Sequence, residues 1–212
     1  MKIVDGAQVE DAVLDTLKAW LSWHLAQVED GRGMERGQTA RPVAWEIVGT
    51  LNETPIRGTP MVVIESPGFQ GSRPTRGVSF DSHATWRIMV HTFTASTTRR
   101  GAAINARIYA AAIRSCLTLH PDLGGIASGV LTVDEDYSGE FRDEENRQFL
   151  AVSHVAATVQ VHEVLSADDI PRVPPPDPLT PPAEAVEART IVVTTSDTGQ
   201  SVTVEAPEDP EP

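Results

Sequence analysis

Histidines on two predicted strands are the side chains whose spacing could support metal chemistry. His83 and His91 flank one predicted strand, and His154 and His162 lie on one face of another. Imidazoles from neighbouring strands can bind one metal ion, so a site across the two strands is geometrically possible. We favour polar positions on a half-exposed sheet face, because no HExxH motif and no cysteine pair accompanies these histidines.

A thiol and an imidazole fall at helical spacing further along the chain. Cys116 and His120 are four residues apart in a helical pattern, which could bring the two groups together. Nucleophilic catalysis also needs a third group that orients the base, and the sequence offers none. We therefore interpret Cys116 as a buried apolar side chain. We expect no catalytic residues, no metal and no cofactor.

Acidic residues gather between positions 134 and 145. The candidates for an acidic, channel-facing or loop surface are Asp134, Asp136, Glu140, Asp143 and Glu144. Such a cluster could in principle hold a divalent cation. A solvated charged loop is the interpretation that we favour.

Two arginine groups are candidate contacts with other subunits. Arg99 and Arg100 open a predicted helix, where positive charge opposes the helix dipole, so either an intersubunit salt bridge or simple solvation would account for them. Arg73 and Arg76 lie in a predicted long loop that also carries Phe69. We favour contact with another protein for this loop, because long loops are often functional.

The first element that the sequence predicts is a helix from about Ala7 to Glu29. Its buried stripe recurs every three or four residues and comprises Val9, Val13, Leu17, Trp20, Leu21, His24, Leu25 and Val28. Asp5 can cap the helix, with Gln8 completing a capping box. Trp20 and Trp23 cannot both occupy the centre of a narrow stripe. One of them, with Trp23 the candidate, therefore lies at the edge and is available to another subunit.

The remaining pattern predicts an α+β fold, with a mainly antiparallel sheet packed against two helices. The second helix spans about 99–113 and begins at Thr97 or Thr98. The predicted strands are Val43–Leu51, Met61–Glu65, Trp86–Phe93, Val130–Asp134 and Gln148–Val164. Ser66–Ser79 and Asp136–Arg147 are predicted to be loops.

A change in composition near residue 166 predicts a C-terminal extension to this core of residues 1–166. Residues 167–188 form a proline-rich acidic linker, 189–206 a β-hairpin, and 207–212 a disordered tail. A lone hairpin is marginal in water, so it should dock on its own core or on a neighbour. Its candidate interface residues are Ile191, Val193, Val202 and Val204.

Charge and composition limit the classes of partner. The net charge is −13, and residues 166–212 contain ten acidic and two basic side chains. This argues against sequence-independent binding to nucleic-acid phosphates, but it suits a surface that DNA slides past without sticking. One cysteine allows no internal disulfide, and we expect no signal peptide and no membrane span.

The order and local texture of these elements resemble a known family. A long N-terminal helix precedes strands, one containing Arg87, and an alanine-rich helix ends at Leu119–Gly125. Strands with Asp136-Tyr137 and Arg147 follow. Over roughly residues 7–165 the chain resembles the tail terminator, or tail completion, proteins of long-tailed bacteriophages (siphoviruses).

That resemblance implies a structural virion protein at the head–tail junction, assembled in the host cytoplasm. It implies a hexameric ring that caps the tail tube and meets a head-side connector protein, with DNA passing through an acidic channel without specific binding. Another neck, stopper or adaptor protein remains an alternative. Other hypotheses are a small metal-dependent hydrolase using His91, His154 and the acidic loop, and a host-factor binder whose acidic tail mimics nucleic acid.

Overall fold

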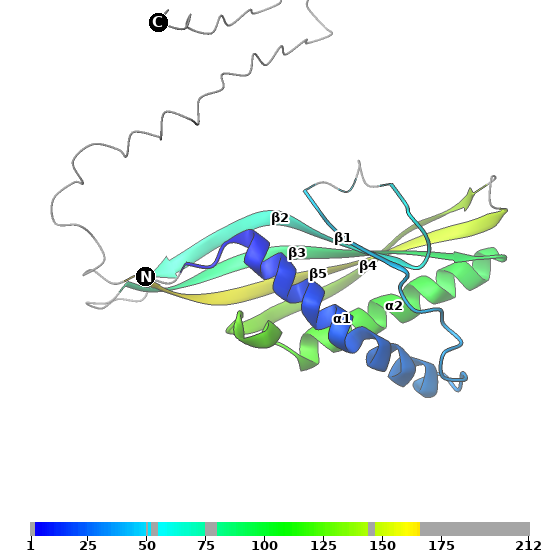
Figure 1. Cartoon of the computed structure of the whole chain (residues 1–212), viewed down its shortest axis with the longest axis horizontal. Coiled ribbons are helices and arrows are strands. Elements are labelled where there is room, and N and C mark those ends of the chain that lie inside the picture. The colour runs from blue at the N-terminus through cyan, green and yellow to red at the C-terminus, as the bar shows by residue number, and fades with distance from the viewer. Residues whose placement is uncertain (1–2, 50, 52–54, 75–79, 144–146, 166–212) are drawn as a thin grey trace, which may run out of the picture. The chain divides into compact units, whose positions relative to one another are not determined.

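The computed structural model describes residues 3–49, 51, 55–74, 80–143 and 147–165. Its elements, in chain order, are α1 (Gly6–Gly31), β1 (Ala44–Val48), β2 (Met61–Pro74), β3 (Phe80–Ser96), α2 (Arg99–Leu119), the 3-10 turn η2 (Leu123–Gly125), β4 (Gly129–Asp143) and β5 (Gln148–Leu165). The arrangement is shown in Figure 1. The predicted hairpin, linker and tail, together with Arg76 and Glu144, lie outside these described residues.

One five-stranded sheet, in the order β1-β2-β3-β5-β4, forms the centre of the fold. β1 pairs with β2 in parallel, and the three other pairings are antiparallel. The longest pairing joins β3 to β5, from Phe80 opposite Leu165 to Ser96 opposite Phe149. The predicted α+β class with a mainly antiparallel sheet is confirmed.

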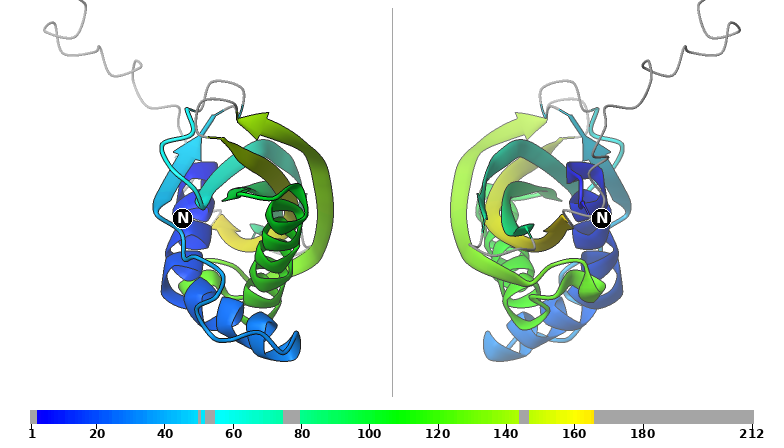
Figure 2. Two further views of the ribbon diagram at one scale, coloured as in Figure 1. Left: turned by 90° about the vertical axis from the view of Figure 1, so that its right-hand side faces the viewer. Right: turned by 90° about the vertical axis from the view of Figure 1, so that its left-hand side faces the viewer.

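Both helices pack on the same face of the sheet (Figure 2). Because side chains alternate along a strand, every second residue of the central strands faces the helices. Val62, Ile88 and Val155 are among these residues, and all three are fully buried against α1 and α2. A smaller cluster around Met61, Val63, Phe93 and Val152 lies on the opposite face.

The start of α1 is capped as its sequence predicts. The Asp5 side chain accepts a hydrogen bond from the Gln8 amide at 2.8 Å, and the Asp5 amide donates to the Gln8 side chain at 3.1 Å. The predicted stripe is buried except at Val28, which is partly buried, and at Trp20. Trp20 and Trp23 both leave about half of their surface exposed. Placing Trp20 in the buried stripe was therefore wrong.

The start of α2 is fixed by Thr98, whose hydroxyl accepts from the Gly101 amide at 3.1 Å. We predict that Thr98→Ala lowers the free energy of unfolding by about 1 kcal/mol, because one helical amide loses its acceptor. The neighbouring Thr97→Ala should leave stability unchanged, since Thr97 is exposed and is not the cap. Denaturant titration of both variants checks this, and equal losses would contradict the assignment of the cap.

Two predicted loops are wrong over most of their length, because the strands continue through them. β2 runs on to Pro74, and its register shifts at Gly68 and Gly71, which adopt φ values of 128° and 131°. In the sequence these glycines indicate a loop. In the structure they lie at register shifts within a paired strand. β4 likewise runs on to Asp143 because it pairs along β5.

Other strand boundaries also differ from the sequence prediction. β1 is shorter than predicted and ends at Val48, whereas β3 is longer than Trp86–Phe93 at both ends.

Neither α1 nor α2 combines the length and the apolar character that crossing a membrane would require.

Candidate functional site

A row of hydrogen-bonded side chains crosses four strands on the sheet face opposite the helices. We call it the histidine row; its members are Glu65 of β2, His91 of β3, His154 of β5 and Ser138 of β4. His91 Nε2 lies 3.0 Å from the Glu65 carboxylate, and the Nδ1 atoms of His91 and His154 lie 2.5 Å apart. His154 Nε2 bonds the Ser138 hydroxyl.

Only one assignment of protons gives every bond in the row a donor and an acceptor when both imidazoles are neutral. A carboxylate only accepts, so His91 donates to Glu65 through Nε2 and must accept at Nδ1. His154 then donates from Nδ1 and accepts at Nε2 from the Ser138 hydroxyl. A second proton on His91 would occupy Nδ1 and bring two N–H groups together at the central bond, whereas a second proton on His154 would occupy Nε2 and donate to the Ser138 hydroxyl.

The surroundings of the row disfavour protonation of its histidines. Burial and the neighbouring His154 lower the pKa of His91, although Glu65 acts in the opposite direction. Burial also lowers the pKa of His154, against the raising effect of Asp136. Both imidazoles are therefore expected to be neutral at pH 7.

We predict that this row makes stability depend on pH between about 7 and 5. The histidines titrate near pH 6.5 in the unfolded chain and lower in the folded one, so acidification favours the unfolded state. The midpoint temperature of thermal unfolding should fall as the pH is lowered from about 7 to 5. The decline should be shallower in a His91→Gln, His154→Gln variant than in a His162→Gln control. Equal slopes in all three proteins would contradict this account.

The structure brings together both of the histidine pairs that the sequence placed on neighbouring strands. The rings of His83 and His162 have centroids 5.2 Å apart, as a second pair on the same two strands. Two nitrogens bound to one zinc ion lie about 3.3 Å apart, so the 2.5 Å between His91 and His154 is a hydrogen bond rather than a pair of ligands. The geometry favours a polar network over the predicted alternative of a metal site.

A shallow pocket of about 390 Å³ lies beside the row. Arg87, Asp134, Asp136 and both row histidines line it. Asp134 and Asp136 are exposed, which agrees with their prediction as surface acids. Glu140 and Asp143 belong to β4 as well, so this acidic segment is a strand and was wrongly predicted to be a loop.

The intervening residues of β4 point toward α2. The Tyr137 hydroxyl donates to Glu135 at 2.6 Å, and Arg114 of α2 forms an ion pair with Glu135 at 2.6 Å. Burial and the Glu135 carboxylate raise the pKa of Tyr137 to about 12. The guanidinium of Arg107 lies over the Tyr137 ring, 5.8 Å from its centroid. β4 therefore presents acids on one face and is attached to α2 by the other.

Exposed apolar side chains on β4 were not predicted from the sequence. Leu131, Tyr137 and Phe141 leave 54%, 45% and 45% of their surfaces exposed. Alternation would not have grouped them either, because the register shift between Ser138 and Glu140 places Tyr137 opposite Ser153 and Phe141 opposite Leu150, on different faces of the sheet. The glycine and the charges around them suggested a loop instead.

The predicted interface residues fall in separate places. Phe69 of β2 is about half exposed and has its ring edge against Trp86 of β3. Arg99 and Arg100 follow the other end of β3, about ten strand residues or roughly 33 Å away. Trp23 lies on α1, and Arg73 lies in β2 rather than in a loop. These candidates therefore do not form one patch.

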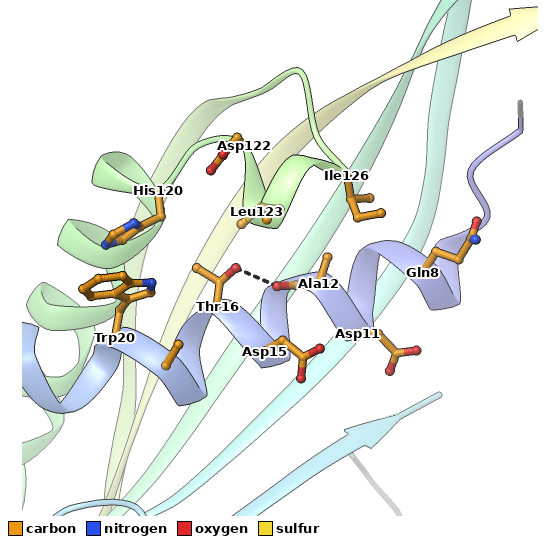
Figure 3. A pocket seen from close by; sticks show the side chains of 12 residues that line it. Gln8, Asp11, Ala12, Asp15, Thr16, Trp20, His120, Asp122, Leu123 and Ile126 are labelled. Atoms are coloured by element: carbon orange, nitrogen blue, oxygen red, sulfur yellow. Dashed lines mark hydrogen bonds between the residues drawn. The ribbon is translucent and has the colours of Figure 1, made fainter.

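A groove of about 620 Å³ lies between α1 and the turn that follows α2. Its lining residues include Gln8, Asp11, Asp15, Thr16, Trp20, His120, Asp122 and Ile126, drawn in Figure 3. His120 stacks on Trp20 with ring centroids 4.5 Å apart, and Asp11 and Asp15 project from the same side of α1 (Figure 3). The stacked pair thus forms one end of an acidic groove.

Comparisons with known proteins return little. No family model matches the chain, and no curated protein matches it. One solved structure that it resembles is described as the virion of a native gene transfer agent particle. The match has a TM-score of 0.37 and 12% identity, and covers 73% of this chain and 95% of that chain. The similar chain is thus part of a virion, at a similarity too low to carry an argument about function.

Proposed function

We propose that the chain is a structural virion protein that forms a ring, caps the phage tail tube and joins it to the head-side connector. The observation that carries this proposal is a sheet with two free edges, one of them bearing exposed apolar side chains. The resemblance in the order of sequence elements supplies the tail terminator family and its hexameric ring. The proposed role is structural and involves no catalysis.

The two free edges lie on opposite sides of the sheet order. β4 ends the sheet on one side, and no strand among the described residues pairs with its outer edge. On the other side the edge has two parts: β1, which pairs only with residues 61–65 of β2, and residues 68–74 of β2, which have β3 as their one described partner. Unpaired edges readily pair with strands of another chain.

Pairing between two different edges is a head-to-tail contact. Such heterologous contacts close into rings when the rotation between copies divides a full turn, and otherwise give open filaments. Leu131 and Phe141 would add apolar burial where β4 meets its neighbour. The proposed ring therefore uses β4 of one copy and the outer part of β2 of the next.

The acids on β4 suit a channel that carries DNA. Asp134 and Asp136 are exposed, and the whole chain has a net charge of −13. Phosphates approaching such a wall are repelled over about a Debye length, roughly 8–10 Å, so DNA would pass without sticking. We propose that these two acids face the channel.

Assembly with a tail-tube protein separates the terminator from another neck component. We expect the purified chain, added to polymerising tube protein, to appear as a cap on tube ends and to stop their growth. Uncapped tubes that keep growing, together with binding to the head-side connector alone, would instead identify a neck, stopper or adaptor protein.

The metal-dependent hydrolase remains a lower-ranked alternative because His91 and His154 do meet. A His91→Ala, His154→Ala double variant should assemble and cap tubes like the unaltered chain if the ring proposal is right. Hydrolytic activity that depends on added metal and disappears in this variant would support the enzyme instead.

Removing residues 167–212 tests the host-factor hypothesis, since the ring should survive that truncation.

A further inference from the structure

We infer that His24, Cys116 and His120 form a binding site for a zinc-like transition-metal ion between α1 and α2. One ligand atom from each residue lies within 4.8 Å of the other two. His24 comes from α1, whereas Cys116 and His120 lie one turn apart at the end of α2. The site is distinct from the histidine row on the opposite face of the sheet.

His24 carries an unused nitrogen inside the protein. The residue is 1% exposed, and its Nε2 has no hydrogen-bond partner. Leaving such a group unpaired costs about 1–3 kcal/mol, so its retention in a core calls for a reason. Its Nδ1 lies 3.0 Å from the Ser115 hydroxyl. That is the usual arrangement of a metal-bound histidine, in which one nitrogen binds the ion and the other is held by a neighbouring polar group.

Cys116 supplies a buried sulfur. Cys116 is fully buried, and the one described hydrogen bond of its sulfur is a 4.0 Å contact to the Thr16 carbonyl. Burial raises the pKa of the thiol to about 12, so without an ion it stays protonated. On binding, the sulfur forms a bond to the ion, the S–H bond breaks, and the proton leaves to solvent.

His120 completes the set and connects it with the surface. Its backbone amide donates to the Cys116 carbonyl at 2.9 Å, which ends α2 with the two side chains one turn apart. Its ring stacks on Trp20 (Figure 3). The same ring meets the His24 ring edge-on, with centroids 5.5 Å apart. His120 is half-buried, so an ion can reach the site beside it.

The donor chemistry selects the class of ion. One thiolate and two imidazoles suit Zn²⁺ and related borderline ions, whereas Ca²⁺ and Mg²⁺ prefer oxygen. Around zinc, ligand atoms lie about 3.3–3.6 Å apart, so atoms that now lie up to 4.8 Å apart must close by at most about 1.5 Å on binding. A water molecule would take the fourth position. The bound ion would tie the middle of α1 to the end of α2.

Titration of the full chain with Co²⁺ alone tests the site, because Cys116 is the only thiol in the chain. We expect one equivalent of Co²⁺ to produce a thiolate-to-cobalt charge-transfer band that Zn²⁺ abolishes by displacement. Zn²⁺ should also raise the thermal midpoint of the unaltered chain. The band should disappear in Cys116→Ser.

Loss of the band in Cys116→Ser could also result from misfolding, so variants that keep the buried sulfur are needed as well. His120→Gln, at a half-exposed position, should weaken Co²⁺ binding at least tenfold, and Ser115→Ala should weaken it about tenfold by releasing the His24 ring. His162→Gln, which removes a histidine far from the site, should bind like the unaltered chain. Absence of the charge-transfer band, or equal affinity in the His120→Gln and His162→Gln variants, would overturn the proposal.

Discussion

Replacing Glu29 by alanine is expected to lower the free energy of unfolding by about 3 kcal/mol. The Glu29 carboxylate is fully buried and accepts hydrogen bonds from the amides of Gly37 and Thr39 at 2.8 and 2.6 Å. It also receives both terminal nitrogens of Arg41, at 3.2 and 3.1 Å. Losing one partner of a buried pair costs about 3–5 kcal/mol, and Arg41, still 31% exposed, should keep the loss near the lower limit.

The same carboxylate should make the fold sensitive to acid in a range of its own. Burial alone would raise the pKa of Glu29, but the hydrogen bonds from Arg41, Gly37 and Thr39 outweigh it and hold the pKa at about 2. Since an unfolded glutamate titrates near pH 4.3, this stabilisation is complete above about pH 5 and is lost as the pH falls toward 2.

A neighbouring residue provides the control for this prediction. Asp30 binds Arg36 at 2.6 Å, but that ion pair is exposed to solvent. Exposed pairs contribute little, so Asp30→Ala should change stability far less than Glu29→Ala. Denaturant unfolding at pH 7 and pH 3 measures both variants. Equal losses at pH 7, or a Glu29→Ala variant as acid-sensitive as the unaltered chain, would show that the network does not anchor this segment.

Substituting Leu131 by lysine is expected to prevent ring assembly while leaving the subunit folded. Leu131 is 54% exposed on β4, so the subunit loses little packing. At the proposed contact the change removes about 1.5 kcal/mol of apolar burial and adds a charge that must be desolvated. Each contact then weakens at least about tenfold, and in a closed ring of six the losses multiply to about a millionfold.

Leu119→Lys makes the same chemical change away from the sheet edge. Leu119 is the last residue of α2 and is 61% exposed. Sedimentation of the two variants at equal concentration should show subunits for Leu131→Lys and rings for Leu119→Lys. Rings in both samples would remove β4 from the interface, and loss of rings in the Leu119→Lys sample alone would move the interface to α2.

Local signals were sufficient to predict the helices and the fold class. The Asp5–Gln8 capping box and the apolar stripe of α1 are encoded within a few residues, and both occur in the structure. The alternation in β3 correctly separated Ile88 and Val90, which face the helices, from His91 on the other face. Periodicity is strong in such segments, because one face is buried.

Long-range partners determined what the sequence did not reveal. Residues 66–74 and 136–143 contain glycine and charge, and they form strands because β3 and β5 offer partners. In the sequence Glu29 is one more residue of a helix. Its hydrogen-bond network forms only because residues 37–41 fold over its carboxylate. The grouping of His24 with Cys116 likewise needs α1 and α2 to pack, since 92 positions separate the two residues in the sequence.

Negative-stain imaging of the purified 212-residue chain tests the ring proposal most directly. We expect closed rings with a central opening, in solution or on addition of tail-tube protein, with six subunits by mass. A stable monomer at all concentrations, which neither forms rings nor caps tubes, would contradict the proposal.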